Sequence, residues 1–501
     1  MFDILKDELV GLMIRLSGEY RDGIPAVRLS QSNMKIFYNL CKEHELEGVV
    51  ASHILEEGLC ELPEYWKEDY LKEKERIEYF KTKTEQICTE MKKNGIPMII
   101  LKNGGIMTDI ISDTAACPME DIDSFIQKDN FLKAHEILLD NGFEFKFRSE
   151  FEKENLQEAF LDGSTEYFMP LPDGGNMWFE LSHRAIAGRW IRPDKEPDTD
   201  ELFRRFYYAD KTDIGILSPE DNLLQVCIHT AKHSYVRSPG LRLHLDVERI
   251  VRHKQIDWKI FLERVKQAHV TTSTYYSLFI PSVLFQTPIP EDVLLALMPP
   301  KGKRKRIEHL LAHAGLLHPQ SAKFTKVQFL FFQTSLYDSI GDVWKVIFPS
   351  TQWYRERYAM KSIVQLPYMI MIRGIKYMGF LSKRDILLLQ AKCDVLVNPR
   401  SNHDEFTKYS FPSKTMEYLL SGSKVVMYAL LGVPYEYFQF IYVIEGYSIE
   451  DLKKALVAAC SDMEFYYNKS QQQIQWISEE KTAKKQVRKL ESIFNNQRGR
   501  T

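Results

Sequence analysis

The sequence predicts an α+β core with helical flanking regions, followed by a smaller α/β unit that contains a parallel sheet. Between residues 96 and 190, patterns of buried strands and helices alternate around two glycines and an Asp-x-Asp motif. The residues on either side show apolar side chains mainly at helical spacing. From about residue 375, apolar strands again alternate with helices, which is typical of a parallel sheet.

The elements of the predicted core follow one another in a definite order. An apolar run at residues 98–101 reads as a buried strand that leads into the two glycines. Residues 131–139 have the pattern of an amphipathic helix, and Gly142 suits the position just after its end. Residues 143–147 alternate as a half-buried strand does. The predicted order is therefore strand, Gly-Gly, helix, Asp-x-Asp strand, helix, strand.

Asp121 and Asp123 are the first candidate site residues. Side chains two apart on a strand point to the same face, so the two carboxylates would lie side by side. Their repulsion is relieved by a cation, which suggests Mg²⁺ or Mn²⁺. Gly104 and Gly105, upstream of the pair, would let the backbone approach a phosphate closely. The plainer interpretation of the pair is a solvated strand end or loop.

This order and these motifs resemble the nucleotidyltransferase fold of the polymerase-beta-like superfamily. A narrower resemblance, to an uncharacterised bacterial nucleotidyltransferase family, covers about residues 30–370. It is carried by Leu101-Lys102, Asp121-Ile122-Asp123, a helix ending in Gly142-Phe143, Glu180 shortly before His183, the helix 223–233, Leu243-His244-Leu245-Asp246, and Phe348-Pro349-Ser350 with Trp353 and Arg357-Tyr358.

The resemblance implies metal-dependent transfer of a nucleoside monophosphate from an NTP to an acceptor hydroxyl. Asp121 and Asp123 would hold Mg²⁺ or Mn²⁺, and Glu180 would complete the site or take the acceptor proton. Lys102 would neutralise triphosphate charge, and the two glycines would receive the triphosphate. The plainer alternatives are a surface glutamate for Glu180 and a strand-end lysine for Lys102. The acceptor, either a polysaccharide precursor or a small molecule, is not identified.

Two residues depart from the pattern of that family. Asn103 stands where a glycine usually follows Leu-Lys, and Cys117 stands where an arginine usually precedes the first aspartate by four residues. The second change removes an expected phosphate or structural contact. It leaves open a catalytically inactive binding protein.

The C-terminal segment, about residues 375–495, resembles the final part of a GT-B glycosyltransferase. The resemblance implies that Ser413 and Lys414 lie near a diphosphate at a helix N-terminus and that Glu417 holds ribose hydroxyls. The acceptor domain and the first part of the donor domain of that family are missing from this sequence. We therefore expect an inactive fused remnant, with a nucleotide-sugar-dependent glycosyltransferase for cell-surface polysaccharide as the alternative function.

Two further patterns favour plain interpretations. His229 and His233 share one helix face and form a possible metal pair, but we expect packing or substrate contact instead. The run 301–306 contains five basic residues and is typical of a solvated loop or helix start.

The composition of the chain narrows the remaining classes of function and location. The net charge of −3 gives no general reason to expect nucleic acid as a partner. The seven cysteines include no C-x-x-C motif, which argues against a disulfide framework or structural zinc. The N-terminus lacks a signal-peptide pattern. The most apolar stretch, residues 364–381, is interrupted by Pro367, Arg373 and Lys376, so no transmembrane segment is expected. We predict a cytoplasmic protein.

The predicted domain organisation has four parts. These are an N-terminal helical region at 1–95, the nucleotidyltransferase-like α/β core at 96–215, a mainly helical region at 216–374 and the partial Rossmann-like domain at 375–501.

Overall fold

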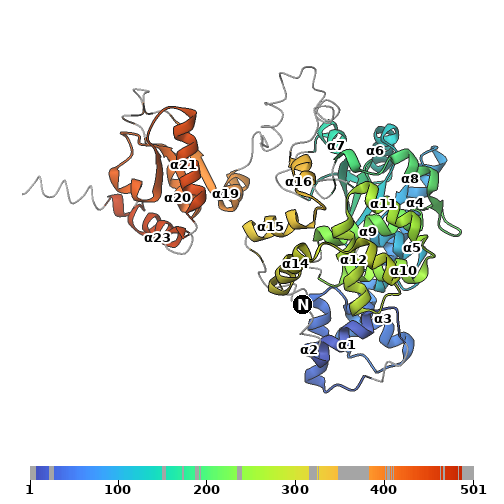
Figure 1. Cartoon of the computed structure of the whole chain (residues 1–501). Coiled ribbons are helices and arrows are strands. Elements are labelled where there is room, and N and C mark those ends of the chain that lie inside the picture. Colours follow the sequence, from blue (N-terminus) through green and yellow to red (C-terminus); the bar gives the residue numbers. More distant parts are fainter. Residues whose placement is uncertain are drawn as a thin grey trace, which may run out of the picture. The chain divides into compact units, whose positions relative to one another are not determined.

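The computed structural model of the chain divides into two compact units, Met1–Lys376 and Tyr377–Thr501 (Figure 1). The structure describes residues 7–21, 27–148, 154–171, 174–186, 191, 193–233, 240–314, 324, 326–347, 383–400, 402, 407, 409, 411–462, 464, 465, 469–482 and 484–487. The predicted family tail from Phe348 to Tyr358 and the apolar stretch 364–381 lie outside these residues.

The first unit begins with helices, as the apolar spacing predicts. Side-chain caps define where two of them start: Asp7 accepts hydrogen bonds from two amides of α1, and Ser30 accepts one from α2. Trp66 on α4 is fully buried and donates its indole N–H to the backbone oxygen of Glu47, which ties α4 to α3. The bounds are α1 Glu8–Ser17, α2 Gln31–Glu43, α3 Glu47–Glu57 and α4 Glu64–Lys93.

A seven-stranded mixed sheet forms the centre of this unit, in the order β3-β4-β5-β2-β1-β7-β6. β2 runs parallel to β5 and antiparallel to β1, so β2 lies in the interior of the sheet. The bounds are β1 Ile99–Ile100, β2 Asp121–Phe125, β3 Glu144–Phe145, β4 Ser164–Pro170, β5 Asn176–Ser182, β6 Tyr207–Tyr208 and β7 Gly215–Ile216.

The two glycines lie inside a helix, α5 Lys102–Asp109, and not in a loop before it. A Cβ on Gly104 would lie 2.7 Å from Cγ2 of Ile100, and one on Gly105 would lie 2.6 Å from the Ile100 oxygen. Their small size therefore allows α5 to pack directly on β1. The other helices inserted between these strands are η2 Thr114–Ala116, η3 Lys128–Asn130, α6 Phe131–Asp140, α7 Leu156–Asp162, η4 Pro193–Lys195 and α8 Thr199–Arg205.

The predicted end of α6 is confirmed. The helix stops at Asp140, and Gly142 follows with φ of 87°, a conformation that glycine adopts without strain. The half-buried strand predicted at 143–147 is also found, although β3 is shorter.

A helical region completes the first unit. Pro219 is the first residue of α9, and the Ser218 hydroxyl accepts a hydrogen bond from the amide of Asp221 at 3.4 Å. The basic run 301–306 opens α14, where Lys303 donates to the Thr272 hydroxyl at 2.8 Å. The bounds are α9 Pro219–His233, α10 Arg242–His253, α11 Trp258–Ala268, α12 Thr271–Leu284, α13 Glu291–Leu297, α14 Lys301–Ala314, α15 Lys326–Leu336 and α16 Ile340–Ile347.

The second unit contains a three-stranded parallel sheet in the order β10-β9-β8, which confirms the predicted strand type. Ser448 and Asp451 form a capping box at the start of α21. The bounds are α19 Lys383–Lys392, β8 Val395–Asn398, α20 Ser413–Leu420, β9 Lys424–Tyr428, η7 Tyr435–Phe440, β10 Ile441–Ile444, α21 Ile449–Ser461 and α23 Ser470–Glu480. Among the described residues, no helix is long and apolar enough to cross a membrane.

A buried ion pair joins the N-terminal helices to the segment that leads into β2. The Arg249 guanidinium on α10 donates to the Glu19 carboxylate at 2.9 Å and to the Ala116 oxygen at 2.9 Å. It also lies 3.8 Å from the Cys117 sulfur. Although burial alone would raise it, contacts with His253 and Arg249 hold the pKa of Glu19 well below its usual range.

Arg249→Met should destabilise the first unit strongly, because it leaves the Glu19 charge buried without its main partner. Removing one member of a buried pair typically costs about 3–5 kcal/mol. Arg204→Met is the control, because Arg204 is 67% exposed and its pair with Glu201 should contribute less than about 1 kcal/mol. Denaturant unfolding measures both variants, and equal losses would contradict the role given to Arg249.

Candidate active site

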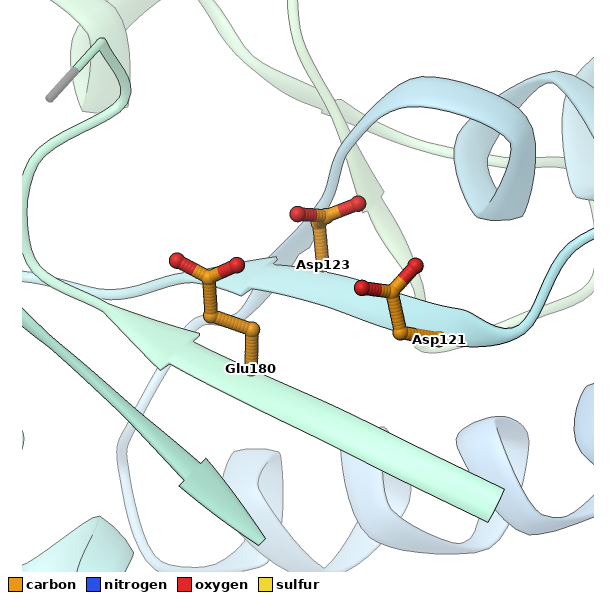
Figure 2. A group of neighbouring side chains, drawn as sticks. All are labelled: Asp121, Asp123 and Glu180. Atoms are coloured by element: carbon orange, nitrogen blue, oxygen red, sulfur yellow. The ribbon is translucent and has the colours of Figure 1, made fainter. Parts of the chain in front are cut away.

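The register between β2 and β5 brings three carboxylates together. Asp123 pairs directly with Glu180 across the two parallel strands, and Asp121 lies two residues earlier on the same strand. One carboxylate oxygen from each residue lies within 4.8 Å of the others. Figure 2 shows all three side chains on the same side of the sheet.

Burial makes this cluster costly without a compensating cation. Asp123 is 8% exposed. Its burial, together with the neighbouring charges of Asp121 and Glu180, raises its pKa to about 7, despite the opposing effect of Lys102. A bound cation would favour the ionised form and offset this cost.

Lys102 contacts the cluster directly. Its ammonium forms a short ion pair with Asp123, and the three carboxylates raise the pKa of Lys102 although burial lowers it. The residue has φ of 53°, which is uncommon outside glycine, at the point where the chain turns from β1 into α5. Backbone strain of this kind is concentrated at functional sites.

Arg148 is a site residue that the sequence analysis missed. Its guanidinium contacts Asp121 at 2.8 Å and Glu166 at 2.9 Å. Glu166 on β4 pairs directly with Glu180 on β5, so the row of acids extends across a third strand. The alternation of apolar and polar residues at 164–170 could have indicated a strand that carries Glu166. No local pattern indicates Arg148, because its contact with Asp121 depends on strands that pair across a long stretch of sequence.

The donor set suits a divalent cation that prefers oxygen ligands. Three carboxylates so close together match the preferences of Mg²⁺ and Mn²⁺. Asp121 and Asp123 each also contact one basic side chain, Arg148 and Lys102 respectively. A bound ion would therefore share or displace these two contacts.

Two cavities meet at the cluster. The larger is about 860 Å³ and extends to residues of α3, α4 and α10, and the smaller is about 90 Å³ and reaches α9. Lys102, Asp123, Glu180 and His229 line both. The larger cavity falls within the size range of small-molecule sites.

The two glycines line neither of these cavities. Close packing against β1 accounts for their size, and the predicted contact of Gly104 and Gly105 with a triphosphate stays a prediction. His229 and His233 lie with their rings 4.9 Å apart beside the larger cavity. Among the described residues, no histidine belongs to a group of three or more possible metal ligands.

The C-terminal candidates lie in the second unit. Lys414 and Glu417 form an ion pair of 2.7 Å at the start of α20, and this contact lowers the pKa of Glu417. Ser413 is the first residue of that helix. The two charged groups predicted to contact a nucleotide-sugar therefore contact each other.

Comparison with known families identifies the first unit. Residues 30–286 match the family described as uncharacterised nucleotidyltransferase. The chain belongs to this family. The match includes the three carboxylates, Lys102 and Arg148, and it ends before the second unit, so the predicted glycosyltransferase resemblance stays a prediction. No curated protein matches the chain, and no solved structure does.

Asp246, on α10, adds another buried acid to the larger cavity. It is 2% exposed, and burial raises its pKa from the usual 3.8 to about 6. Because the unfolded chain ionises this group more readily, the charge destabilises the folded state increasingly as the pH rises from about 4 to 6.

Asp246→Asn should therefore increase the free energy of unfolding at pH 7.5, by up to about 3 kcal/mol. The gain should be small near pH 4 and disappear below about pH 3, where the wild-type carboxyl is largely protonated in both states. Thermal or denaturant unfolding across this range measures the difference. A variant less stable than wild type at pH 7.5 would show that the charge is compensated.

Proposed function

We propose that the first unit transfers a nucleoside monophosphate from an NTP to an acceptor hydroxyl, with Mg²⁺ or Mn²⁺ as cofactor and pyrophosphate as the second product. The observation that carries this proposal is the placement of Asp121, Asp123 and Glu180 on one face of two paired strands. Membership of a nucleotidyltransferase family supports the reaction class. Fold alone would not support it.

Each residue has a definite role in this proposal. Asp121 and Asp123 would hold the metal, and Glu180 would complete the site or accept the proton of the acceptor hydroxyl. When bound, the divalent ions would stabilise the charge on the attacking and leaving oxygens. The acceptor oxygen would form a bond to the α-phosphorus, while the bond between that phosphorus and the oxygen bridging the α- and β-phosphates would break. Lys102 and Arg148, which pair with Asp123 and Asp121, would contact the triphosphate once a metal shares these carboxylates.

The replacement of the usual arginine by Cys117 does not favour an inactive protein. Cys117 is fully buried and is absent from the lining of both cavities at the carboxylates. A guanidinium still reaches this position, because Arg249 contacts Cys117 and the adjacent Ala116 oxygen. The change therefore leaves the acidic cluster itself intact.

Replacing Asp121 and Asp123 by asparagine should abolish metal-dependent NTP binding. Loss of an outer partner of a metal ligand typically costs 10–100-fold in affinity, so loss of two ligands should cost at least about 100-fold. Calorimetry with a non-hydrolysable NTP and Mg²⁺ measures the change. Asp140→Asn, at the exposed end of α6, is the control and should bind as wild type does. Unchanged metal-dependent binding in the double variant would remove the assignment.

Glu417→Gln in the full chain should leave Mg²⁺-dependent NTP binding unchanged, because Glu417 belongs to the other unit. The same titrations with UDP- and GDP-sugars test the alternative function. Glycosyl transfer by the wild-type chain that is lost in Glu417→Gln would favour the glycosyltransferase over the nucleotidyltransferase.

A further inference from the structure

The larger cavity contains hydrogen-bond acceptors that are not needed to hold a metal. Asp246 is 2% exposed and lines the cavity, where the positive charges of Arg242, Arg249 and Lys102 favour its ionised form without any of them pairing with it directly. Asn103 is 5% exposed and lines the same cavity. Its amide nitrogen donates to the Pro118 oxygen at 2.9 Å, but its Oδ1 accepts nothing from the described residues.

Glu47 adds a third acceptor to this lining. Its Oε2 is buried without a hydrogen-bond partner among the described residues, and burial raises the pKa of Glu47 to about 7. Close packing fixes its position, because a Cβ on the adjacent Gly48 would lie 2.2 Å from the Ala115 oxygen. The helix that begins with Glu47 is therefore held tightly against η2.

Backbone contacts also hold the other two acceptors. The Pro118 oxygen accepts hydrogen bonds from Asn103 at 2.9 Å and from Arg242 at 3.3 Å. Arg242 lies one helical turn before Asp246 on α10 and also pairs with Glu45 at 2.9 Å. This network joins α5 to α10, so Asn103 and Asp246 are held on two fixed helices.

Buried acceptors without donors destabilise the free protein. A ligand that supplies O–H or N–H donors would compensate for this cost. The charge of the cavity indicates which donors fit, because its described lining contains nine acidic side chains and six lysines or arginines. A nucleoside triphosphate with two divalent ions is neutral overall, so a loaded cavity keeps this excess of acids. An anionic acceptor would be repelled, and a cationic one attracted.

We propose that Glu47, Asn103 and Asp246 form the acceptor subsite, and that the acceptor carries an ammonium group among several hydroxyls, as an amino sugar does. The role of this ligand as the acceptor rests on the proposed nucleotidyl transfer, whereas its binding at these three residues does not. The subsite itself is a binding site for an aminated polyol. Asp246 pairs with the ammonium, while Asn103 and Glu47 accept hydrogen bonds from hydroxyls.

Three hexoses that differ mainly in charge test the subsite. Saturation-transfer NMR on the full chain, with and without Mg²⁺ and a non-hydrolysable NTP, compares glucosamine, glucose and glucuronate. Glucosamine should bind most tightly and glucuronate least. Asp246→Asn should weaken glucosamine binding by about tenfold or more, since a hydrogen bond to a charged group is lost. This variant should remain folded, because it removes a buried charge whose burial outweighs the favourable effect of the nearby cations.

Glu73→Gln is the matched control. Glu73 lines the same cavity and its loss changes the net charge equally, but it is already paired with Arg76 at 2.7 Å. It should bind glucosamine as wild type does. Absent glucosamine binding, equal binding of glucuronate, or an unaffected Asp246→Asn variant would overturn the subsite. NTP binding, measured by calorimetry on the same samples, reports separately on the proposed function and should be unchanged in Asp246→Asn.

Discussion

The parallel pairing of β2 with β5 is the constraint on which the site depends. It sets Asp123 directly opposite Glu180, and the two-residue period of a strand then brings Asp121 to the same face. A shift of register by one residue would turn Glu180 to the opposite face and dissolve the cluster. The buried side chains of Met177, Phe179 and Leu181, which alternate with Glu180 on β5, resist such a shift, because it would move them from the core to the face of the carboxylates.

The same pairing explains why the site lowers the stability of the folded protein. It brings carboxylates that repel one another into a buried position. Lys102 pairs with Asp123 and Arg148 pairs with Asp121, and these two contacts offset part of the repulsion. Asp246 forms no such direct ion pair with a described residue, although the charges of Arg242, Arg249 and Lys102 favour its ionised form. A fold selected for stability alone would replace these residues, so their presence together is best explained by ligands that supply the missing charge.

Local patterns in the sequence were enough to predict the strand with Asp121 and Asp123, the end of α6 and the parallel sheet of the second unit. Each of these predictions depends on a short repeat of apolar residues or on a glycine, which has unusual backbone freedom. Arg148 was missed because its contact with Asp121 arises from strands that pair out of chain order. The two glycines were placed before the helix, because a glycine pair has the same local pattern whether it approaches a phosphate or a neighbouring strand.

The fate of the two ends of the triphosphate tests the central claim most directly. The full chain, Mg²⁺ and a cell extract are incubated with NTPs labelled at the α- or the γ-phosphate, and products are separated from free nucleotide. Nucleotidyl transfer predicts that α-label becomes attached to an acceptor, that γ-label leaves as pyrophosphate, and that Asp123→Asn loses both. Attachment of γ-label to the acceptor, or transfer that persists in Asp123→Asn, would contradict the account.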